Sequence, residues 1–166
     1  MTNFRNLVIA PLNNAHDRQA FTCGIESLDR YLKKQAGQDV KRKISRVFVA
    51  TAADAPTTVV GYYTLSTLSI DLTRLPSDLA CKLPRHPIPA ALIGRLACLK
   101  QAQSNHVGKM LLMDALKRTL AVSSDIAIYA MVVDAIDDQA ARFYQQYGFA
   151  QLTSEDRRLF LPLRSV

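Results

Sequence analysis

Hydrophobic and polar residues follow two different periods along this chain, and each period predicts its own kind of element. Between Ile25 and Val40, apolar residues recur every three or four positions, which is one face of an amphipathic helix. Gly37 is the point where that helix can break. Residues 46–52 and 59–66 are β-branched and aromatic runs, which predict two strands.

The second half of the chain predicts two further strand–helix pairs. Residues 92–99 form a nearly continuous apolar run, typical of a strand buried on both faces, which only Arg95 interrupts. Residues 107–122 are apolar on almost every side, typical of a helix packed firmly against a sheet. Another helix is expected between Asp137, which can cap it, and Gly148, which can end it. The remaining expectations are strands over residues 7–12, 127–133, 149–152 and 158–163, a hairpin connection over 53–58, and irregular chain over 75–89.

The order of these elements predicts a mixed α/β fold (an α+β sandwich) in which helices flank one largely antiparallel sheet. The chain has 166 residues and no separating linker, so we expect a single domain over residues 1–166. Its hydrophobic fraction of 49% and charged fraction of 21% are ordinary for a globular protein and argue against global disorder.

The sequence predicts neither secretion nor membrane insertion. No apolar run reaches the roughly 18 residues that a membrane span requires. The first residues lack the charged start, long apolar stretch and cleavage site of a signal peptide. The three cysteines, at positions 23, 81 and 98, cannot all pair within one chain, and none lies in a CxxC motif. We therefore expect reduced thiols in a cytoplasmic protein without a membrane partner.

Positive charge is concentrated in one short window. The net charge of the chain is +7, and residues 30–46 supply +6 of it, because seven basic residues there accompany a single acid, Asp39. Such a window favours a polyanionic partner, and the alternative is a helix face that is simply solvated. The basic residues are Arg30, Lys33, Lys34, Lys41, Arg42, Lys43 and Arg46.

The sequence lacks the common signatures of nucleotide, zinc and triad chemistry. It contains no P-loop, no GxGxxG, no HExxH, no EF-hand loop and no GxSxG. The three histidines, at positions 16, 86 and 106, share no metal-ligand spacing with the cysteines, so no metal site is expected.

The polar turn over residues 101–108 is the most informative segment. It follows the buried strand and opens the long apolar helix. The N-terminus of a helix offers unpaired backbone N–H groups and a partial positive charge, so it binds phosphate well. Lys109 adds a cation just inside the helix. The alternative is an ordinary connection between a strand and a helix.

This segment resembles motif A of the GNAT N-acetyltransferase family. The stretch RLAC ends the strand as RLAV does in that family, and Gln103, His106 and Gly108 occupy the three positions of its Q/R-x-x-G-x-G/A turn. The chain differs at Ser104 and His106, where the family usually has Gly. The resemblance implies that the pantetheine arm of acetyl-CoA pairs with the backbone of Leu96, Ala97 and Cys98. It also implies that the pyrophosphate lies against Gln103, Ser104, Asn105, His106, Val107, Gly108 and Lys109.

A second stretch, residues 140–149, resembles motif B of the same family. Tyr144 matches the tyrosine that protonates the departing thiolate of coenzyme A. A thiol of pKa about 8.5 and a phenol of pKa about 10 are close enough for general acid catalysis. The alternative is an aromatic core residue, like Phe143 and Tyr147. The resemblance also places Phe143 and Asp137 beside the cofactor, Asp137 standing where the family often has Asn.

From about residue 20 to residue 163, the chain is similar to the GNAT toxins of type II toxin–antitoxin modules. The stretches that carry the resemblance are FTCG, LDRYLKKQA, RVFVA, VVGYYTLS, IPAALIGRLA and RLFLPL. It implies a toxin that transfers acetyl from acetyl-CoA to the α-amino group of aminoacyl-tRNA and so blocks translation. It also implies a homodimer and a ribbon-helix-helix antitoxin, and the toxin would meet operator DNA only through its complex with that antitoxin.

The residues agree with an α-amine as acceptor. No carboxylate or histidine is an obvious general base, and an α-amine of pKa about 8 is partly neutral at pH 7, whereas a lysine amine of pKa about 10.4 is not. The basic window, together with Arg85 and Arg95, would meet the tRNA backbone. One alternative is a GNAT enzyme that acetylates a small amine, a peptide or a protein N-terminus. The other is a catalytically decayed GNAT scaffold that binds nucleic acid or a protein partner.

Overall fold

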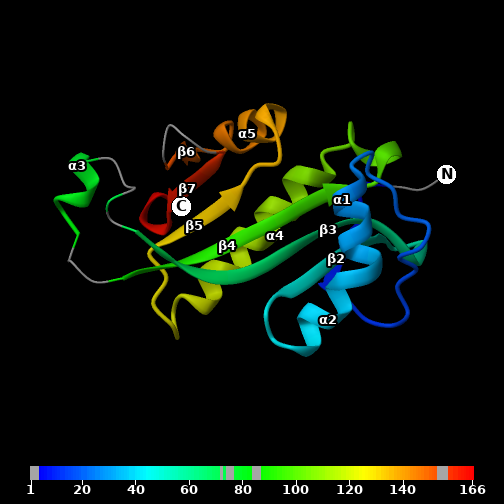
Figure 1. Ribbon diagram of the computed structural model, residues 1–166. Coiled ribbons are helices and arrows are strands. Elements are labelled where there is room, and N and C mark those ends of the chain that lie inside the picture. Colours follow the sequence, from blue (N-terminus) through cyan, green and yellow to red (C-terminus); the bar gives the residue numbers. More distant parts are fainter. Residues whose placement is uncertain (1–3, 72, 74–76, 84–86, 153–156) are drawn as a thin grey trace. The chain divides into compact units, whose positions relative to one another are not determined.

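The computed structural model describes residues 4–71, 73, 77–83, 87–152 and 157–166 (Figure 1). Its strands are β1 (Leu7–Pro11), β2 (Arg46–Ala52), β3 (Ala55–Ile70), β4 (Ile88–Cys98), β5 (Ala130–Asp134), β6 (Ala150–Gln151) and β7 (Arg158–Pro162). Its helices are α1 (Glu26–Arg30), α2 (Ala36–Lys41), α3 (Ser77–Ala80), α4 (Val107–Val122) and α5 (Asp138–Gln145). A π-helical turn and two short 3-10 turns complete the description: η1 (Tyr31–Gln35), η3 (Lys100–Ala102) and η4 (Leu163–Ser165).

The described strands form one seven-stranded sheet in the order β1-β2-β3-β4-β5-β7-β6. β2 pairs antiparallel with β1 and β3, and β7 pairs antiparallel with β5 and β6. β4 and β5 run parallel, from Ala90 opposite Ala130 to Ile93 opposite Val133. The mixed, mostly antiparallel sheet with flanking helices that the sequence predicts is therefore confirmed.

The chain divides into two compact units. One unit consists of Met1–Ser66 and Arg95–Lys117, and the other of Thr67–Gly94 and Arg118–Val166. Strands β3 and β4 and helix α4 each contribute residues to both units. Among the described helices, none combines the length and the apolar character that crossing a membrane requires.

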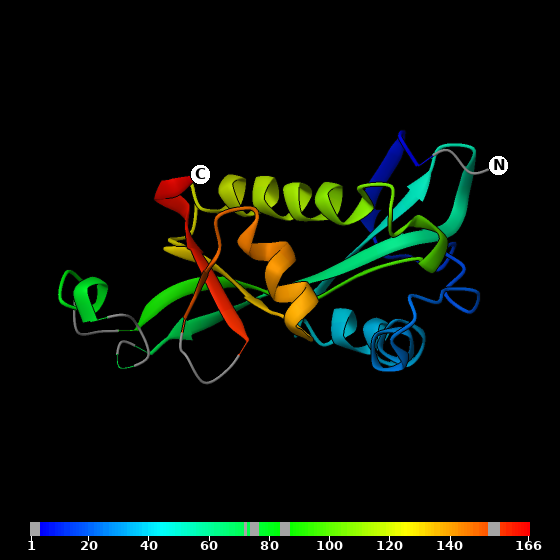
Figure 2. The same ribbon diagram turned by 90° about the horizontal axis from the view of Figure 1, so that it is seen from above.

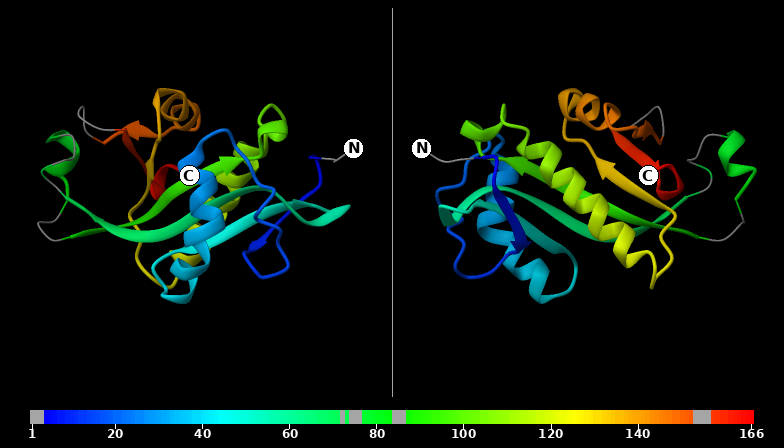
Figure 3. Two further views of the ribbon diagram at one scale, coloured as in Figure 1. Left: turned by 45° about the vertical axis from the view of Figure 1, so that its right-hand side comes forward. Right: turned by 180° about the vertical axis from the view of Figure 1, so that it is seen from behind.

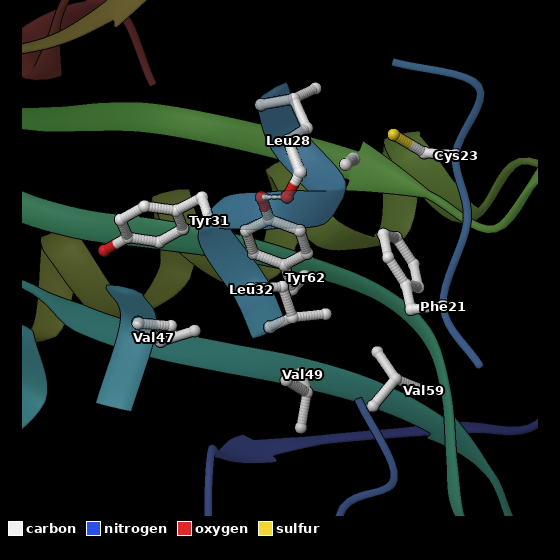
Figure 4. Packing of buried hydrophobic residues seen from close by; sticks show 11 residues of the cluster. Phe21, Cys23, Leu28, Tyr31, Leu32, Val47, Val49, Val59 and Tyr62 are labelled. Carbon is white, nitrogen blue, oxygen red and sulfur yellow. Dashed lines mark hydrogen bonds between the residues drawn. The ribbon is translucent and has the colours of Figure 1, made fainter. Parts of the chain in front are cut away.

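The first unit packs its helices on both faces of its strands. In Figure 2, the α1–α2 segment lies on one face of β2 and β3, and the start of α4 lies on the other. The core on the α1–α2 side is drawn in Figure 4, where the Tyr62 hydroxyl donates a hydrogen bond to the Leu28 carbonyl oxygen at 2.6 Å. Other members of this cluster include Phe21, Tyr31, Leu32, Val47, Val49, Val59 and Ala97.

The helical segment of the first unit widens into a π turn instead of breaking at a glycine. The helix continues through Gly37, so the expected break there is wrong. A Cβ atom at Gly37 would meet only Arg18 Nη1, at 3.4 Å, so packing does not require glycine at this position. The irregularity falls earlier, in η1, where Tyr31 and Leu32 are buried. A π turn takes up more residues than an α turn, so it rotates the residues before it relative to those after it.

The second unit places α5 beside β5 and β7 (Figure 3). Asp137 caps α5 as predicted, because its Oδ1 accepts a hydrogen bond from the Ala140 N–H at 2.8 Å. Gly148, also as predicted, follows the helix with a φ of 94°, which favours glycine. A second apolar cluster lies in this unit and consists of Ile70, Ile88, Ala90, Ala130, Val132, Leu152 and Phe160.

Two strands are longer than their apolar runs predict. β3 begins at Ala55, because Ala52 and Ala55 face each other across a tight turn at Ala53 and Asp54. The hairpin connection is therefore shorter than the expected 53–58. β4 begins at Ile88, two residues before its register with β5 starts at Ala90.

The irregular stretch expected over 75–89 is confirmed over residues 81–83 and at Pro87, and is wrong in the rest of its described parts. It contains α3, and its end belongs to β4. Residues 75, 76 and 84–86 of this stretch lie outside the described residues. β5 starts at Ala130 and not at residue 127, because its pairing with β4 begins with Ala130 opposite Ala90. One residue earlier, the Tyr129 N–H donates a hydrogen bond to the Pro89 carbonyl oxygen at 2.9 Å.

Candidate functional site

The turn between β4 and α4 ends in a row of free backbone donors. Leu99 closes the strand with a hydrogen bond from its N–H to the Val60 carbonyl oxygen at 2.7 Å. The first hydrogen bond of α4 runs from the Met110 N–H to the His106 carbonyl oxygen at 3.1 Å. The N–H groups of Val107, Gly108 and Lys109 precede this bond, and they have no partner in the described part of the chain. Such a group of donors suits an anion.

His106 adopts a backbone conformation that favours glycine. Its φ is 60°, in the left-handed region, at the position where the related motif has glycine. The side chains of Ser104, Asn105, His106 and Lys109 are all exposed, whereas Val107 is buried. The turn therefore takes up a backbone conformation that favours glycine while its polar side chains remain exposed to solvent.

Gln103 holds the turn in place. Its Nε2 donates to the carbonyl oxygens of Cys23, at 2.7 Å, and Cys98, at 3.2 Å. The Lys100 N–H donates to the Thr22 carbonyl oxygen at 2.9 Å and ties the same two segments together. The sequence interpretation makes Gln103 a phosphate contact, but its amide nitrogen is already engaged by two carbonyl oxygens. Its side chain therefore acts on the turn by positioning it.

Gly61 sets the distance between β3, β4 and α4, and the sequence interpretation missed it. A Cβ atom there would lie 2.9 Å from Leu111 Cδ1, 3.0 Å from the Ala97 carbonyl oxygen and 3.3 Å from Val107 Cγ1. Only a residue without a side chain allows this approach. The signal was available, because a glycine inside a predicted strand marks a close backbone contact.

The last residues of β4 alternate in burial. Ala97 is buried and belongs to the core, whereas Leu96 and Cys98 are half-buried. Burial raises the pKa of the Cys98 thiol to about 12, and burial together with a hydrogen-bonded Asp29 raises that of Cys23 to about 11. Both cysteines therefore remain protonated thiols at neutral pH.

Helix α5, in the second unit, carries the tyrosine of the second motif. Tyr144 is 4% exposed, and its ring meets Phe143 and Phe149 edge-on at centroid distances of 5.2 Å and 5.6 Å. Phe143 also meets Tyr147, at 5.3 Å. The carboxylate of Asp137 is used in capping the helix. The ring of Tyr144 is thus held rigidly by its aromatic neighbours.

Most of the basic window is open to solvent, as its amphipathic pattern predicts. Lys33 is half-buried, and the exposed members are Arg30, Lys34, Lys41, Arg42, Lys43 and Arg46. Arg30 pairs with Glu26 one turn earlier, so part of its charge is offset. Arg85 and its neighbour His86 lie outside the described residues.

Arg95 has a different environment from the exposed cations. It is half-buried, and its guanidinium carbon lies 3.7 Å from the centroid of the Tyr31 ring. No cluster of three or more metal-ligating side chains occurs among the residues that the structure describes.

Comparison with known proteins gives close relatives over nearly the whole chain. No protein-family model matches. The chain is 34% identical over 168 residues to a probable toxin TacT from Sinorhizobium fredii, an alignment that covers 96% of this chain and 92% of that protein. It is 32% identical over 155 residues to a tRNA-acetylating toxin from Mycobacterium tuberculosis, with coverage of 93% and 91%.

Solved structures agree with these relatives. A tyrosine-to-phenylalanine mutant of KacT superimposes with a TM-score of 0.91 at 29% identity, over 97% of both chains. AtaT complexed with acetyl-methionyl-tRNAfMet gives 0.88 at 30% identity, over 96% of both chains. A tyrosine-to-phenylalanine mutant of AtaT, bound to the C-terminus of the antitoxin AtaR and to acetyl-CoA, gives 0.82 at 27% identity, over 96% of this chain and 95% of that one.

Proposed function

The chain belongs to the GNAT toxins of type II toxin–antitoxin modules, and on that premise we propose that it transfers the acetyl group of acetyl-CoA to the α-amino group of an aminoacyl-tRNA. The observation that carries this proposal is the 32% identity, over 93% of the chain, to a tRNA-acetylating toxin. An acetylated α-amine is no longer a nucleophile for peptide-bond formation. Translation therefore stops.

Acetyl-CoA is proposed to bind along the end of β4 and at the start of α4. The free N–H groups of Val107, Gly108 and Lys109 would hold the pyrophosphate, and the exposed ammonium of Lys109 adds a positive charge. Ser104, Asn105 and His106 would border the phosphates. The backbone of Leu96, Ala97 and Cys98 would pair with the pantetheine arm like an added strand.

Tyr144 is proposed as the general acid. The neutral amine attacks the thioester carbonyl carbon, the new C–N bond forms, the C–S bond breaks, and the thiolate takes a proton from the phenol. The proton that the nitrogen loses passes to water, from which the phenolate is protonated again. The rigid aromatic surroundings of Tyr144 support this role, because a proton donor must be held in place. Phe143 and Asp137 are proposed beside the cofactor arm.

The basic window is proposed to bind the tRNA backbone, with Arg85 and Arg95 nearer the acceptor end. Exposed cations give salt-sensitive affinity with little sequence preference. Replacing Lys41, Arg42 and Lys43 with Glu should weaken acetylation of tRNA and leave acetyl-CoA binding intact. Unchanged turnover on tRNA would remove this window from the proposal.

The antitoxin partner is proposed to be of the ribbon-helix-helix type, with operator DNA bound only through the toxin–antitoxin complex. AtaT, bound in its mutant form to the C-terminus of the antitoxin AtaR, supports the pairing with an antitoxin. We further propose that residues 1–166 act as one catalytic domain, that the toxin is a homodimer, and that it acts in the cytoplasm, where aminoacyl-tRNA is made. Light scattering on the purified chain tests the dimer.

The decisive test is transfer of label from acetyl-CoA into a pool of charged tRNAs by the purified full-length chain. Tyr144→Phe should lower turnover about 10²-fold or more, while acetyl-CoA affinity changes little. Tyr147→Phe, in the turn that directly follows α5, is the matched control and should keep full turnover.

Three results would overturn parts of this function. Equal rates for Tyr144→Phe and the wild type would remove the acid role. Label that enters free amines or peptides but not charged tRNA would favour a different acceptor. Failure to bind acetyl-CoA in calorimetry would indicate a decayed scaffold.

A further inference from the structure

Arg95 stands out because its guanidinium is oriented by an aromatic ring but is held by no hydrogen bond or close ion pair among the described residues. Its planar group stacks on Tyr31, with 3.7 Å between the guanidinium carbon and the ring centroid. Among the described residues, no carboxylate lies within ion-pair distance of this guanidinium and no acceptor receives its N–H groups, although its charge interacts at longer range with the Asp39 carboxylate. Stacking occupies the face of the group and leaves its edge, with the forked N–H donors, available. A guanidinium that is partly removed from water and already oriented binds an anion more strongly than a fully exposed one.

Tyr31 is itself fixed by buried groups. Its hydroxyl donates to Asp39 Oδ2 at 2.7 Å, and Gln35 Nε2 donates to Asp39 Oδ1 at 3.0 Å. The Tyr31 ring also lies nearly parallel to that of Tyr62, with 6.3 Å between the centroids and 16° between the planes, and Figure 4 shows the two rings side by side. Tyr31 and Asp39 are 5% and 9% exposed. The ring therefore offers Arg95 a surface that cannot rotate.

The backbone fixes the other end of the Arg95 side chain. The Arg95 N–H donates to Thr64 Oγ1 at 3.0 Å, and Thr64 is buried. Arg95 directly precedes Leu96, the first of the three residues proposed to pair with the pantetheine arm. At a rise of about 3.3 Å per residue, Arg95 lies about 13 Å along β4 from Leu99, where the turn begins. It therefore marks the end of the site away from the pyrophosphate, where the acyl group would lie.

We propose that Arg95, oriented by Tyr31 and Asp39, is a preformed binding site for the phosphodiester that joins the last two nucleotides of the tRNA acceptor strand. This inference rests on the proposed function. The aminoacyl end of tRNA carries an ester and no free carboxylate, so its nearest anion is that phosphodiester. A guanidinium binds it through two parallel charge-assisted hydrogen bonds. Arg95 thus contacts the substrate, and Tyr31 and Asp39 are positioning residues.

Three substrates that differ in their phosphodiesters test the proposal on the full-length chain. They are aminoacyl-tRNA, 3′-O-aminoacyl-CpA with one phosphodiester, and 3′-O-aminoacyl-adenosine with none. All carry the amino acid whose tRNA the wild-type protein acetylates best. Wild-type kcat/KM should be about 10- to 100-fold higher for the dinucleotide than for aminoacyl-adenosine.

Arg95→Gln should abolish the preference for the dinucleotide over aminoacyl-adenosine, through a higher KM for the dinucleotide. Arg95→Lys keeps a charge but lacks the fork, so it should retain only part of the preference. Tyr31→Phe keeps the ring and loses the bond to Asp39, so its preference should fall several-fold. Arg18→Gln removes a half-buried arginine of the same unit outside this site and should keep the full preference.

Two results would overturn this site and leave the proposed function standing. One is a wild-type protein that acetylates aminoacyl-tRNA but does not distinguish the dinucleotide from aminoacyl-adenosine. The other is an Arg95→Gln or Arg95→Lys protein whose kcat/KM falls equally on both small substrates, since a merely structural role has that effect. A wild-type protein that acetylates no aminoacyl-tRNA would overturn the proposed function and this site with it.

Discussion

Substituting Gly61 with alanine should separate α4 from the strands that it covers. The added Cβ would lie 2.9 Å from Leu111 Cδ1 and 3.0 Å from the Ala97 carbonyl oxygen, against about 3.5–4.0 Å for an unstrained carbon contact. Leu111 is fully buried and cannot move aside, and the Ala97 oxygen belongs to the backbone. Overpacking of this kind costs about 1–3 kcal/mol. Replacing a strand glycine with alanine also reduces the conformational entropy of the unfolded chain, which stabilises the folded protein by about 0.5–1 kcal/mol.

The net expectation is a loss of about 1–2 kcal/mol, which in a chain of this size lowers Tm by about 2–8 °C. The displaced groups include the backbone proposed to pair with the pantetheine arm, so acetyl-CoA affinity should fall as well. Differential scanning calorimetry and isothermal titration with acetyl-CoA measure the two effects.

Gly37→Ala is the matched control for this substitution. Its Cβ would meet only Arg18 Nη1, the far end of a flexible side chain, at 3.4 Å. Alanine inside a helix is favoured over glycine by about 1 kcal/mol, so Tm should rise or stay level, with acetyl-CoA affinity unchanged. A Gly61→Ala protein as stable as the wild type, with the same acetyl-CoA affinity, would refute the close-packing argument.

Three further outcomes are expected. His106→Gly should be more stable than His106→Ala by about 1 kcal/mol, because only glycine adopts the φ of 60° at that position without strain, and equal Tm values would contradict this. Asp137→Ala removes the cap of α5 and should cost about 0.5–2 kcal/mol in a urea titration, while Asp137→Asn, which can still cap, should cost little. Iodoacetamide at pH 8 should modify the exposed Cys81 before Cys23 and Cys98, whose thiols have raised pKa values of about 11 and 12. Mass spectrometry measures the order, and modification of Cys98 first would count against its burial.

Elements with a strong period were predictable from the sequence. The expected helix over residues 107–122 and strand over 46–52 match α4 and β2 in both bounds, since each buries a continuous face and ends at a change of composition. The bounds of β3 and β4 were not predictable. Their extra residues pair with neighbouring strands, and the hydrophobic pattern within a segment does not show such pairing.

The candidate site likewise has features that local sequence predicts and features that only tertiary contacts create. The turn and its helix could be found from the sequence, because a polar connector between a buried strand and an apolar helix is a local feature. The contact of Gln103 with Cys23 and the stacking of Arg95 on Tyr31 join residues more than 60 positions apart in the sequence, and only the fold brings them together. The contact between Arg95 and Tyr31 had one sign in the local sequence, which is that Arg95 is a charged residue inside an apolar strand.

The π turn at η1 has a consequence for evolutionary comparison. One extra residue in a helical turn has the effect of a single-residue insertion. Sequences whose helix is regular at this point can be aligned with this chain only by a one-residue gap within Tyr31–Gln35. Without that gap, the residues before the π turn, including Arg30 and Tyr31, are aligned one position away from their true counterparts. A relative that lacks the extra residue but keeps the tyrosine would then wrongly appear to have replaced it.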